Sequence, residues 1–109
     1  MRFAVENWIR CFDEHKKQTT IRLLPTEIGH HKAYGGNYLT PTLLGEFDIV
    51  KVKKIKFSDL TEKEAKLDGF DTLKELKDEL LKIYKTRLSE HTFIYQHWMK
   101  NIVLREGKE

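Results

Sequence analysis

The stretch FSDLTEKEAKLDGFDTLKELKDELLKIY, residues 57–84, decides the fold of this chain. It contains two capping boxes, at residues 61–64 and 72–75, in which a threonine is followed three residues later by a glutamate. Such a box marks the start of a helix, because its two side chains satisfy backbone N–H groups that have no partner within the helix. We therefore expect a short helix that ends at Gly69 and a longer one that runs to about Tyr84.

The longer helix has apolar residues at the spacing of one helical face. This face is expected to pack on the core and comprises Leu73, Leu76, Leu80, Ile83 and Tyr84.

Alternating apolar and polar residues predict three strands, over residues 18–24, 47–57 and 92–103. The alternation of the second strand slips at Lys53-Lys54, which predicts a β-bulge there. The third strand is apolar on both faces, so we expect it at the centre of the sheet.

An amphipathic helix is predicted over residues 3–14, where apolar residues follow Val5 at helical spacing. Trp8 and Phe12 lie on its apolar face and are expected in the core. The single cysteine, Cys11, lies beside that face and is interpreted as a small buried hydrophobic residue.

Residues 25–45 contain both prolines and four of the six glycines, and predict a long loop with at most one short strand near residues 37–39. Loops of this length are uncommon in small domains unless they have a function. Lys32, Tyr34 and Tyr38 make a ligand-facing flap plausible, and an ordinary surface loop with turn glycines explains the composition equally well.

The elements follow the order helix, strand, loop, strand, helix, helix, strand. Strands distant in sequence must pair, which predicts an α+β fold with a curved mixed sheet or a small barrel and flanking helices. The 109 residues fit a single domain, expected over residues 1–104, followed by a frayed tail at 105–109.

The composition of the chain excludes several kinds of functional site. One cysteine excludes an internal disulfide and a cysteine-rich zinc site. The five histidines include no pair at helical i, i+4 spacing, and no nucleotide-binding glycine motif occurs, so we expect neither a metal nor a cofactor.

No apolar run is long enough to span a membrane, and we expect a cytoplasmic protein. A net charge of +3 permits an anionic partner.

The first predicted strand begins within EHKKQTTIRLLP, residues 14–25. Thr20 and Arg22 are two residues apart, so their side chains emerge on the same face, and Lys17 in the preceding turn can reach that side. Two cations beside a hydroxyl suit an anionic or carbonyl-bearing ligand. Thr20 would then be a candidate nucleophile with Lys17 as its base. The same residues also occur on ordinary surface strands.

The segment KKQTTIR resembles the G-x-K-x-x-T-x-R signature of the ASCH domain family, whose fold is similar to that of PUA domains. Residues 57–84 also resemble the corresponding part of that family, and the resemblance covers about residues 5–100. It implies a small β-barrel with flanking helices and a cleft that holds the signature residues.

The resemblance implies binding of RNA or nucleotides. Some small bacterial members are amidohydrolases that deacetylate N4-acetylcytidine with a lysine, a threonine and a glutamate. Carried over, these positions fall on Lys17, Thr20 and Asp68, and the signature arginine is Arg22. The chain departs from the family at His15, which replaces the signature glycine, and at Asp68, which replaces the glutamate. It also lacks the expected Gly-Asp strand start within residues 25–44.

Three functions follow as hypotheses. The first is an RNA- or nucleotide-binding module in which Lys17 and Arg22 contact phosphate or a base edge. Lys32 is a further predicted ligand-binding residue, and Tyr34 or Tyr38 stacks on a base. The second is an amidohydrolase acting on an acylated nucleoside. The third is a scaffold that binds another protein.

Overall fold

A computed structural model describes residues 1–37 and 39–105. Its elements are α1 (Val5–Ile9), β1 (Thr19–Arg22), β2 (Gly29–Gly36), β3 (Pro41–Lys56), the 3₁₀ turn η1 (Phe57–Asp59), α2 (Glu62–Leu67), α3 (Leu73–Tyr84), the 3₁₀ turn η2 (Lys85–Arg87) and β4 (Phe93–Leu104). Of the tail predicted at 105–109, only Arg105 is described, and its N–H donates to the carbonyl of Leu44. None of the helices described is long and apolar enough to cross a membrane.

The four strands form one sheet in the order β1-β4-β3-β2, which confirms the α+β class and the inner position of β4. All three strand pairings are antiparallel, so the expectation of a mixed sheet is wrong. The sheet is open over the described strands, with β1 and β2 at its edges, and the closure into a barrel implied by the resemblance is not seen in this part of the chain.

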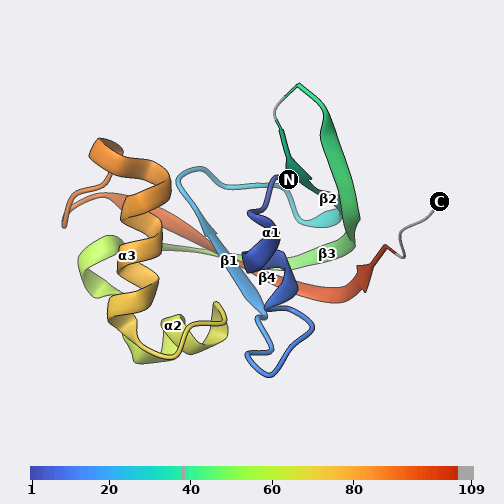
Figure 1. Ribbon diagram of the computed structural model, residues 1–109. Coiled ribbons are helices and arrows are strands. Elements are labelled where there is room, and N and C mark those ends of the chain that lie inside the picture. Colours follow the sequence, from blue (N-terminus) through green and yellow to red (C-terminus); the bar gives the residue numbers. More distant parts are fainter. Residues whose placement is uncertain (38, 106–109) are drawn as a thin grey trace.

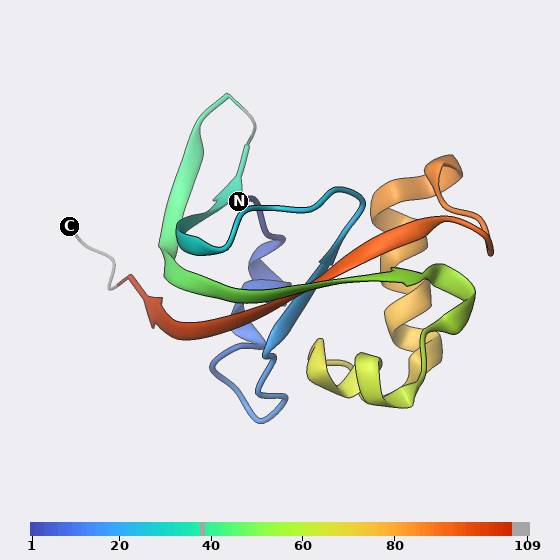
Figure 2. The ribbon, with the colours of Figure 1, turned by 180° about the vertical axis from the view of Figure 1, so that it is seen from behind.

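Two hydrophobic cores lie at opposite ends of the sheet. Helices α2 and α3 cover one end, while α1 and the β2–β3 hairpin lie at the other (Figures 1 and 2). The helical core contains Ile21, Phe57, Leu60, Ala65, Phe70, Leu76, Leu80, Leu88 and Ile94. The hairpin core contains Phe3, Trp8, Ala33, Phe47, Ile49 and Met99.

Both predicted capping boxes are confirmed, with Thr61 capping α2 and Thr72 capping α3. Gly69, which follows α2, has a φ of +89°, the left-handed conformation expected of a glycine at a helix end. The predicted core face of α3 is correct except at Ile83, whose side chain is 49% exposed.

The N-terminal helix is shorter than predicted and ends at Ile9. The chain then enters a turn in which the Asp13 carboxylate accepts a hydrogen bond from the backbone N–H of His15. Trp8 is fully buried as expected, whereas Phe12 is 39% exposed, so its assignment to the core is wrong. Cys11 packs against the hairpin core, and burial raises the pKa of its thiol to about 11, as expected for an inert cysteine.

The long loop predicted at residues 25–45 is wrong, because β2 and the first part of β3 occupy most of it. The glycines were interpreted as turn signals, but Gly35 and Gly45 lie inside strands and allow close packing there. A Cβ at Gly35 would lie 2.8 Å from Leu44 Cδ1, so a side chain there would meet the neighbouring strand.

The bulge predicted at Lys53-Lys54 is misplaced, since these residues pair in regular register with Gln96 and Tyr95. The β3–β4 register shifts instead between Glu46 and Asp48 and between Ile49 and Lys51. The alternation misled because Val50, at the second shift, is exposed although it is apolar.

Candidate functional site

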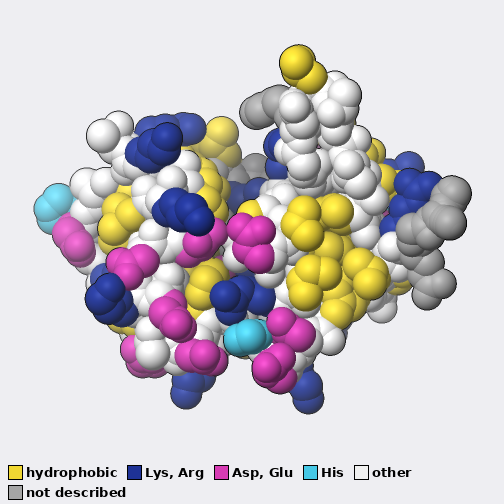
Figure 3. Space-filling model, viewed as in Figure 1, with side chains coloured by type: hydrophobic (Ala, Val, Ile, Leu, Met, Phe, Trp, Pro, Cys, Tyr) yellow, Lys and Arg dark blue, Asp and Glu magenta, His cyan; other side chains and the backbone are white. Residues whose placement is uncertain are grey.

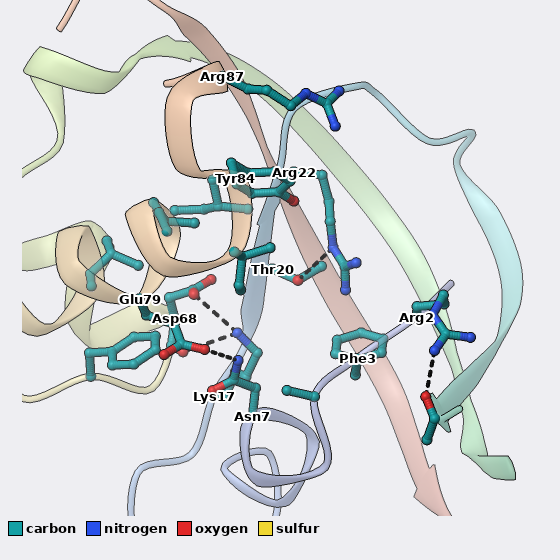
Figure 4. Close-up of a pocket in the computed structure, with 17 residues that line it drawn as sticks. Arg2, Phe3, Asn7, Lys17, Thr20, Arg22, Asp68, Glu79, Tyr84 and Arg87 are labelled. Atoms are coloured by element: carbon teal, nitrogen blue, oxygen red, sulfur yellow. Dashed lines mark hydrogen bonds and ion pairs between the residues drawn. The ribbon is translucent and has the colours of Figure 1, made fainter. Parts of the chain in front are cut away.

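A pocket of about 620 Å³ opens between the two cores, beside the edge strand β1 (Figure 4). Side chains from both cores contribute to its wall: Phe3 belongs to the hairpin core, and Leu76 and Leu80 to the helical core. The charged and polar residues of its lining are Arg2, Asn7, Lys17, Thr20, Arg22, Asp68, Glu79, Tyr84 and Arg87. Figure 3 shows a notch between the α3 side and the β2–β3 hairpin.

A buried ion pair lies in this pocket. Lys17 Nζ is 3.1 Å from Asp68 Oδ2, with side-chain exposures of 3% and 6%. The same ammonium donates to the backbone carbonyl of Asp68 at 3.1 Å. Backbone bonds hold both partners, because Lys17 N–H donates to the carbonyl of Arg10 and Asp68 N–H donates to the carbonyl of Glu64 in α2.

The second oxygen of Asp68 is also satisfied. Thr19 Oγ1 donates to Asp68 Oδ1 at 3.1 Å, and Gln96 Nε2 donates to Thr19 Oγ1 at 3.4 Å. Burial raises the pKa of the Asp68 carboxyl, and the Lys17 ammonium and the Thr19 hydroxyl oppose that rise. The carboxylate is therefore held by a small buried network rather than presented openly to a ligand.

Thr20 and Arg22 form a second unit on β1. Arg22 Nε donates to Thr20 Oγ1 at 3.1 Å, and the guanidinium lies over the Phe3 ring, 4.6 Å from its centroid. Thr20 is buried, and its hydroxyl faces the pocket together with Arg22 (Figure 4). The prediction that these two side chains share one face of the strand is thus confirmed.

His97 supports Thr20 from the neighbouring strand β4. Its Nδ1 lies 3.1 Å from the Thr20 carbonyl oxygen, and its Nε2 accepts a hydrogen bond from the Thr26 backbone N–H at 3.0 Å. A neutral ring with the proton on Nδ1 satisfies both contacts. Burial, assisted by the Arg22 charge, lowers the pKa of His97.

We expect His97 to remain neutral to a lower pH than the exposed His30, whose pKa is raised by hydrogen bonds with Asp48 and Glu46. The pKa of His97 is lower in the folded state than in the unfolded state. The contribution of His97 to the free energy of unfolding therefore decreases as the pH falls from its unfolded-state pKa toward its folded-state pKa. A ¹⁵N-detected NMR titration of the histidine rings measures both pKa values. Titration of His97 above His30 would contradict the assigned contacts.

The structure brings together four of the residues singled out in the sequence, because Lys17, Thr20, Arg22 and Asp68 all line the same pocket. Their catalytic and binding roles stay predictions. Lys32 and Tyr34 lie in β2 and do not line this pocket.

Tyr38 lies outside the described residues. The structure therefore offers no support for the predicted aromatic flap at this site.

His15, which stands where the ASCH signature has glycine, lies in the turn before β1. His15 does not adopt a positive φ, whereas the next residue, Lys16, does so with a φ of +49°. The left-handed residue of the turn into β1 is thus Lys16, one position after His15. Gly69 approaches this turn closely, because a Cβ there would lie 2.9 Å from Lys17 Cβ.

Sequence reasoning missed several pocket residues. Asn7 Nδ2 donates to Glu79 Oε2 at 3.0 Å and so links α1 to α3 across 72 positions of sequence. Arg2 donates to the Gly36 carbonyl, and Arg87 reaches the pocket from η2. No local pattern distinguishes these residues from ordinary surface positions, because only the tertiary fold brings them to the pocket.

A group that the histidine spacing did not reveal lies in the turn after α1. One ligand atom from each of Asp13, Glu14 and His15 falls within 4.8 Å of the others. Asp13 Oδ1 already contacts His15 Nδ1 at 2.9 Å, and exposed acidic groups of this kind are common without a metal.

Comparisons with known proteins give no match to a protein-family model and no significant match to a curated protein sequence. Two solved structures are similar in fold. One is the ASCH domain from Lactobacillus crispatus JV V101, with a TM-score of 0.64, 15% identity, and coverage of 84% of this chain and 67% of that one. The other is a DUF984 protein from Enterococcus faecalis V583, with a TM-score of 0.56, 15% identity, and coverage of 81% and 61%.

At 15% identity these likenesses establish the fold and carry no residue roles with them. The similarity to the ASCH domain covers 84% of the chain. The resemblance to ASCH domains found in the sequence is therefore confirmed at the level of the fold.

Proposed function

We propose that the pocket beside β1 binds RNA or a nucleotide. The observation that supports this most is the convergence of Lys17, Thr20, Arg22 and Asp68 on one hollow of about 620 Å³, within the usual size range of ligand sites. The proposal takes residues 1–104 as a single cytoplasmic domain.

The side chains divide into two roles in this proposal. Lys17 is already neutralised by Asp68, so Arg22 is the better candidate to contact a phosphate or a base edge. Tyr84 lines the pocket from the end of α3 and takes the stacking role first assigned to Tyr34 or Tyr38. An unpaired base can stack on such a ring without sequence preference.

Arg22→Gln is expected to weaken binding of a structured RNA with a single-stranded loop by about tenfold. It should also reduce the slope of log affinity against log salt concentration by about 0.7, the value of one lost phosphate contact on a single strand. Fluorescence anisotropy across a salt series measures both quantities. Lys74→Ala removes one positive charge from an exposed part of α3 and is the matched control.

Binding that is independent of salt, or equal for Arg22→Gln and the control, would remove the electrostatic contact from the proposal. Circular dichroism of each variant checks that the fold is retained. Lys17→Ala is less informative, because it leaves the Asp68 carboxylate buried without its partner.

The second candidate is an amidohydrolase acting on an acylated nucleoside such as N4-acetylcytidine. It is favoured by the hydroxyl of Thr20 and the Lys17–Asp68 pair lining the same pocket. Two contacts weigh against it: the Thr20 hydroxyl is hydrogen-bonded to Arg22, and Lys17 contacts Asp68. A base must reach the proton that it removes, although unliganded sites often tighten only when substrate binds.

Incubation with N4-acetylcytidine and detection of cytidine tests this candidate. Thr20→Val keeps the shape of the side chain and removes the hydroxyl, so it must stop the reaction if Thr20 is the nucleophile. Absence of turnover in the parent chain, or full turnover in Thr20→Val, rejects the mechanism.

The scaffold hypothesis rests on exposed apolar side chains. Val5 and Ile9 on α1 and Phe12 after it are each about two-fifths exposed, and Figure 3 shows hydrophobic atoms gathered beside the position of α1. The polar pocket on the neighbouring surface favours a small or extended ligand instead. We therefore rank the scaffold third.

A further inference from the structure

Three arginines stand where the main pocket meets a second hollow. This hollow has a volume of about 330 Å³ and shares Arg2, Arg22, Tyr84 and Arg87 with the main pocket. The three guanidinium groups come from different parts of the chain: the N-terminal segment, β1 and η2. Figure 4 shows them spaced around one side of the pocket, with Lys17 and Asp68 at the opposite side.

Carboxylates are scarce beside this junction in the part of the chain that the structure describes. Among the described residues, neither Arg22 nor Arg87 forms an ion pair with a carboxylate. The carboxylates of the main pocket are Asp68, which pairs with Lys17, and Glu79, which accepts a hydrogen bond from Asn7. The described lining of the second hollow contains arginines and His31 but no carboxylate.

Several guanidinium groups lining one pocket are a common protein arrangement for binding a phosphate group. Each carries donors in a rigid fork that fits phosphate oxygens, and a phosphate monoester offers three terminal oxygens and up to two negative charges. Two of the cations that line the main pocket, Arg22 and Arg87, have no carboxylate partner among the described residues, and such a dianion would supply one. The walls also provide the apolar and aromatic contacts that a nucleoside needs, through Phe70 and Tyr84.

We propose that the junction of the two hollows, formed by Arg2, Arg22 and Arg87, is a phosphate subsite, and that the ligand of the pocket is a nucleoside 5′-monophosphate group rather than an unphosphorylated nucleoside. The inference rests on the proposed function and adds the ligand class and two arginines that the sequence did not indicate. The phosphate lies at the arginines, and the nucleoside extends toward Thr20 and Phe70.

Isothermal titration calorimetry of the full chain tests the subsite. The ligands are the four common ribonucleosides, their 5′-monophosphates and inorganic phosphate. The monophosphates are expected to bind at least about tenfold more tightly than the nucleosides at low salt. Arg87→Ala is expected to remove most of that difference, and Arg87→Glu to reverse it. Arg87 is exposed, so both variants should fold.

Lys82→Ala is the charge-matched control, because Lys82 is exposed on α3 and does not line either hollow. A short RNA with and without a 5′-phosphate distinguishes a mononucleotide from an RNA end as the source of the phosphate.

The outcomes separate the two proposals. Equal affinity for nucleosides and monophosphates, or equal loss in Arg87→Ala and Lys82→Ala, overturns the phosphate subsite and leaves the binding pocket standing. Inorganic phosphate that binds as tightly as the monophosphates also overturns it, because the nucleoside then contributes nothing. Failure of every nucleoside, nucleotide and RNA to bind overturns the proposed function itself.

Discussion

The Asp68→Ala variant is expected to unfold with a free energy about 3–5 kcal/mol below that of the parent chain. The substitution leaves the Lys17 ammonium buried beside a backbone carbonyl without its counter-ion, and the Thr19 hydroxyl without an acceptor. An unpaired buried charge costs far more than the pair itself contributes, because water no longer solvates it. Urea denaturation followed by circular dichroism measures the loss.

Replacing both members of the pair separates the net contribution of the ion pair to stability from the cost of leaving one buried charge unpaired. Lys17→Met with Asp68→Leu fills the same space with apolar atoms and is expected to recover at least half of the stability lost in Asp68→Ala. The chain offers an exposed comparison in Lys74 and Asp78, whose side chains are 83% and 59% exposed. Asp78→Ala is expected to cost less than about 1 kcal/mol. A double variant as unstable as Asp68→Ala would show that the burial of charge is not the dominant cost.

This pair also bears on the choice between the two leading proposals. An amidohydrolase that uses Lys17 as its base needs the amine to reach the proton that it removes, and in the structure Lys17 Nζ contacts the Asp68 carboxylate and the Asp68 carbonyl oxygen, each at 3.1 Å. A binding pocket needs no such change, because the pair can shape the wall while other groups contact the ligand. The geometry therefore favours binding over catalysis at this site.

The elements that the sequence predicted well carry their signals locally. The capping boxes of α2 and α3 bond backbone groups within four residues of themselves, so their effect does not depend on the rest of the fold. Strand β4 was also predicted closely, because its β-branched and aromatic residues are apolar on both faces.

The errors concern features that depend on distant contacts. The face of α1 was predicted from periodicity alone, but a helix of five residues presents only Trp8 to the core and leaves Val5 and Ile9 exposed. Gly35 and Gly45 serve packing between strands, which no local pattern distinguishes from a turn.

The residues of the candidate site also fall into two groups, those with a local sequence signal and those that only distant contacts bring to the pocket. Lys17, Thr20 and Arg22 lie within six residues and were indicated by their spacing together with the family resemblance. Asp68 is 51 positions from Lys17 and was indicated by the resemblance alone. Arg87 had neither signal, because its place at the pocket depends on how η2 follows α3.

Gly45→Ala is expected to lower the free energy of unfolding by about 3 kcal/mol, the upper part of the usual range for overpacking. Gly45 lies in β3 between Ala33 of β2 and Leu104 of β4. A Cβ at this position would collide with the carbonyl oxygen of Val103 and lie 2.8 Å from Trp8 Cζ2. Neither neighbour can yield easily, because one is backbone in the adjacent strand and the other is a fully buried indole ring.

Gly35→Ala is the matched control for this argument, since its Cβ would also approach a neighbour at 2.8 Å. That neighbour is the end of the flexible Leu44 side chain, which can move aside, and the nearest backbone atom, the Phe3 carbonyl oxygen, would lie at 3.3 Å rather than in collision. A loss of about 1 kcal/mol is therefore expected. Thermal and urea denaturation of both variants compare the two costs directly. Equal losses would mean that β3 and β4 can separate at Gly45 as easily as a leucine side chain rotates. The close approach of these two strands would then not be the reason that position 45 requires glycine.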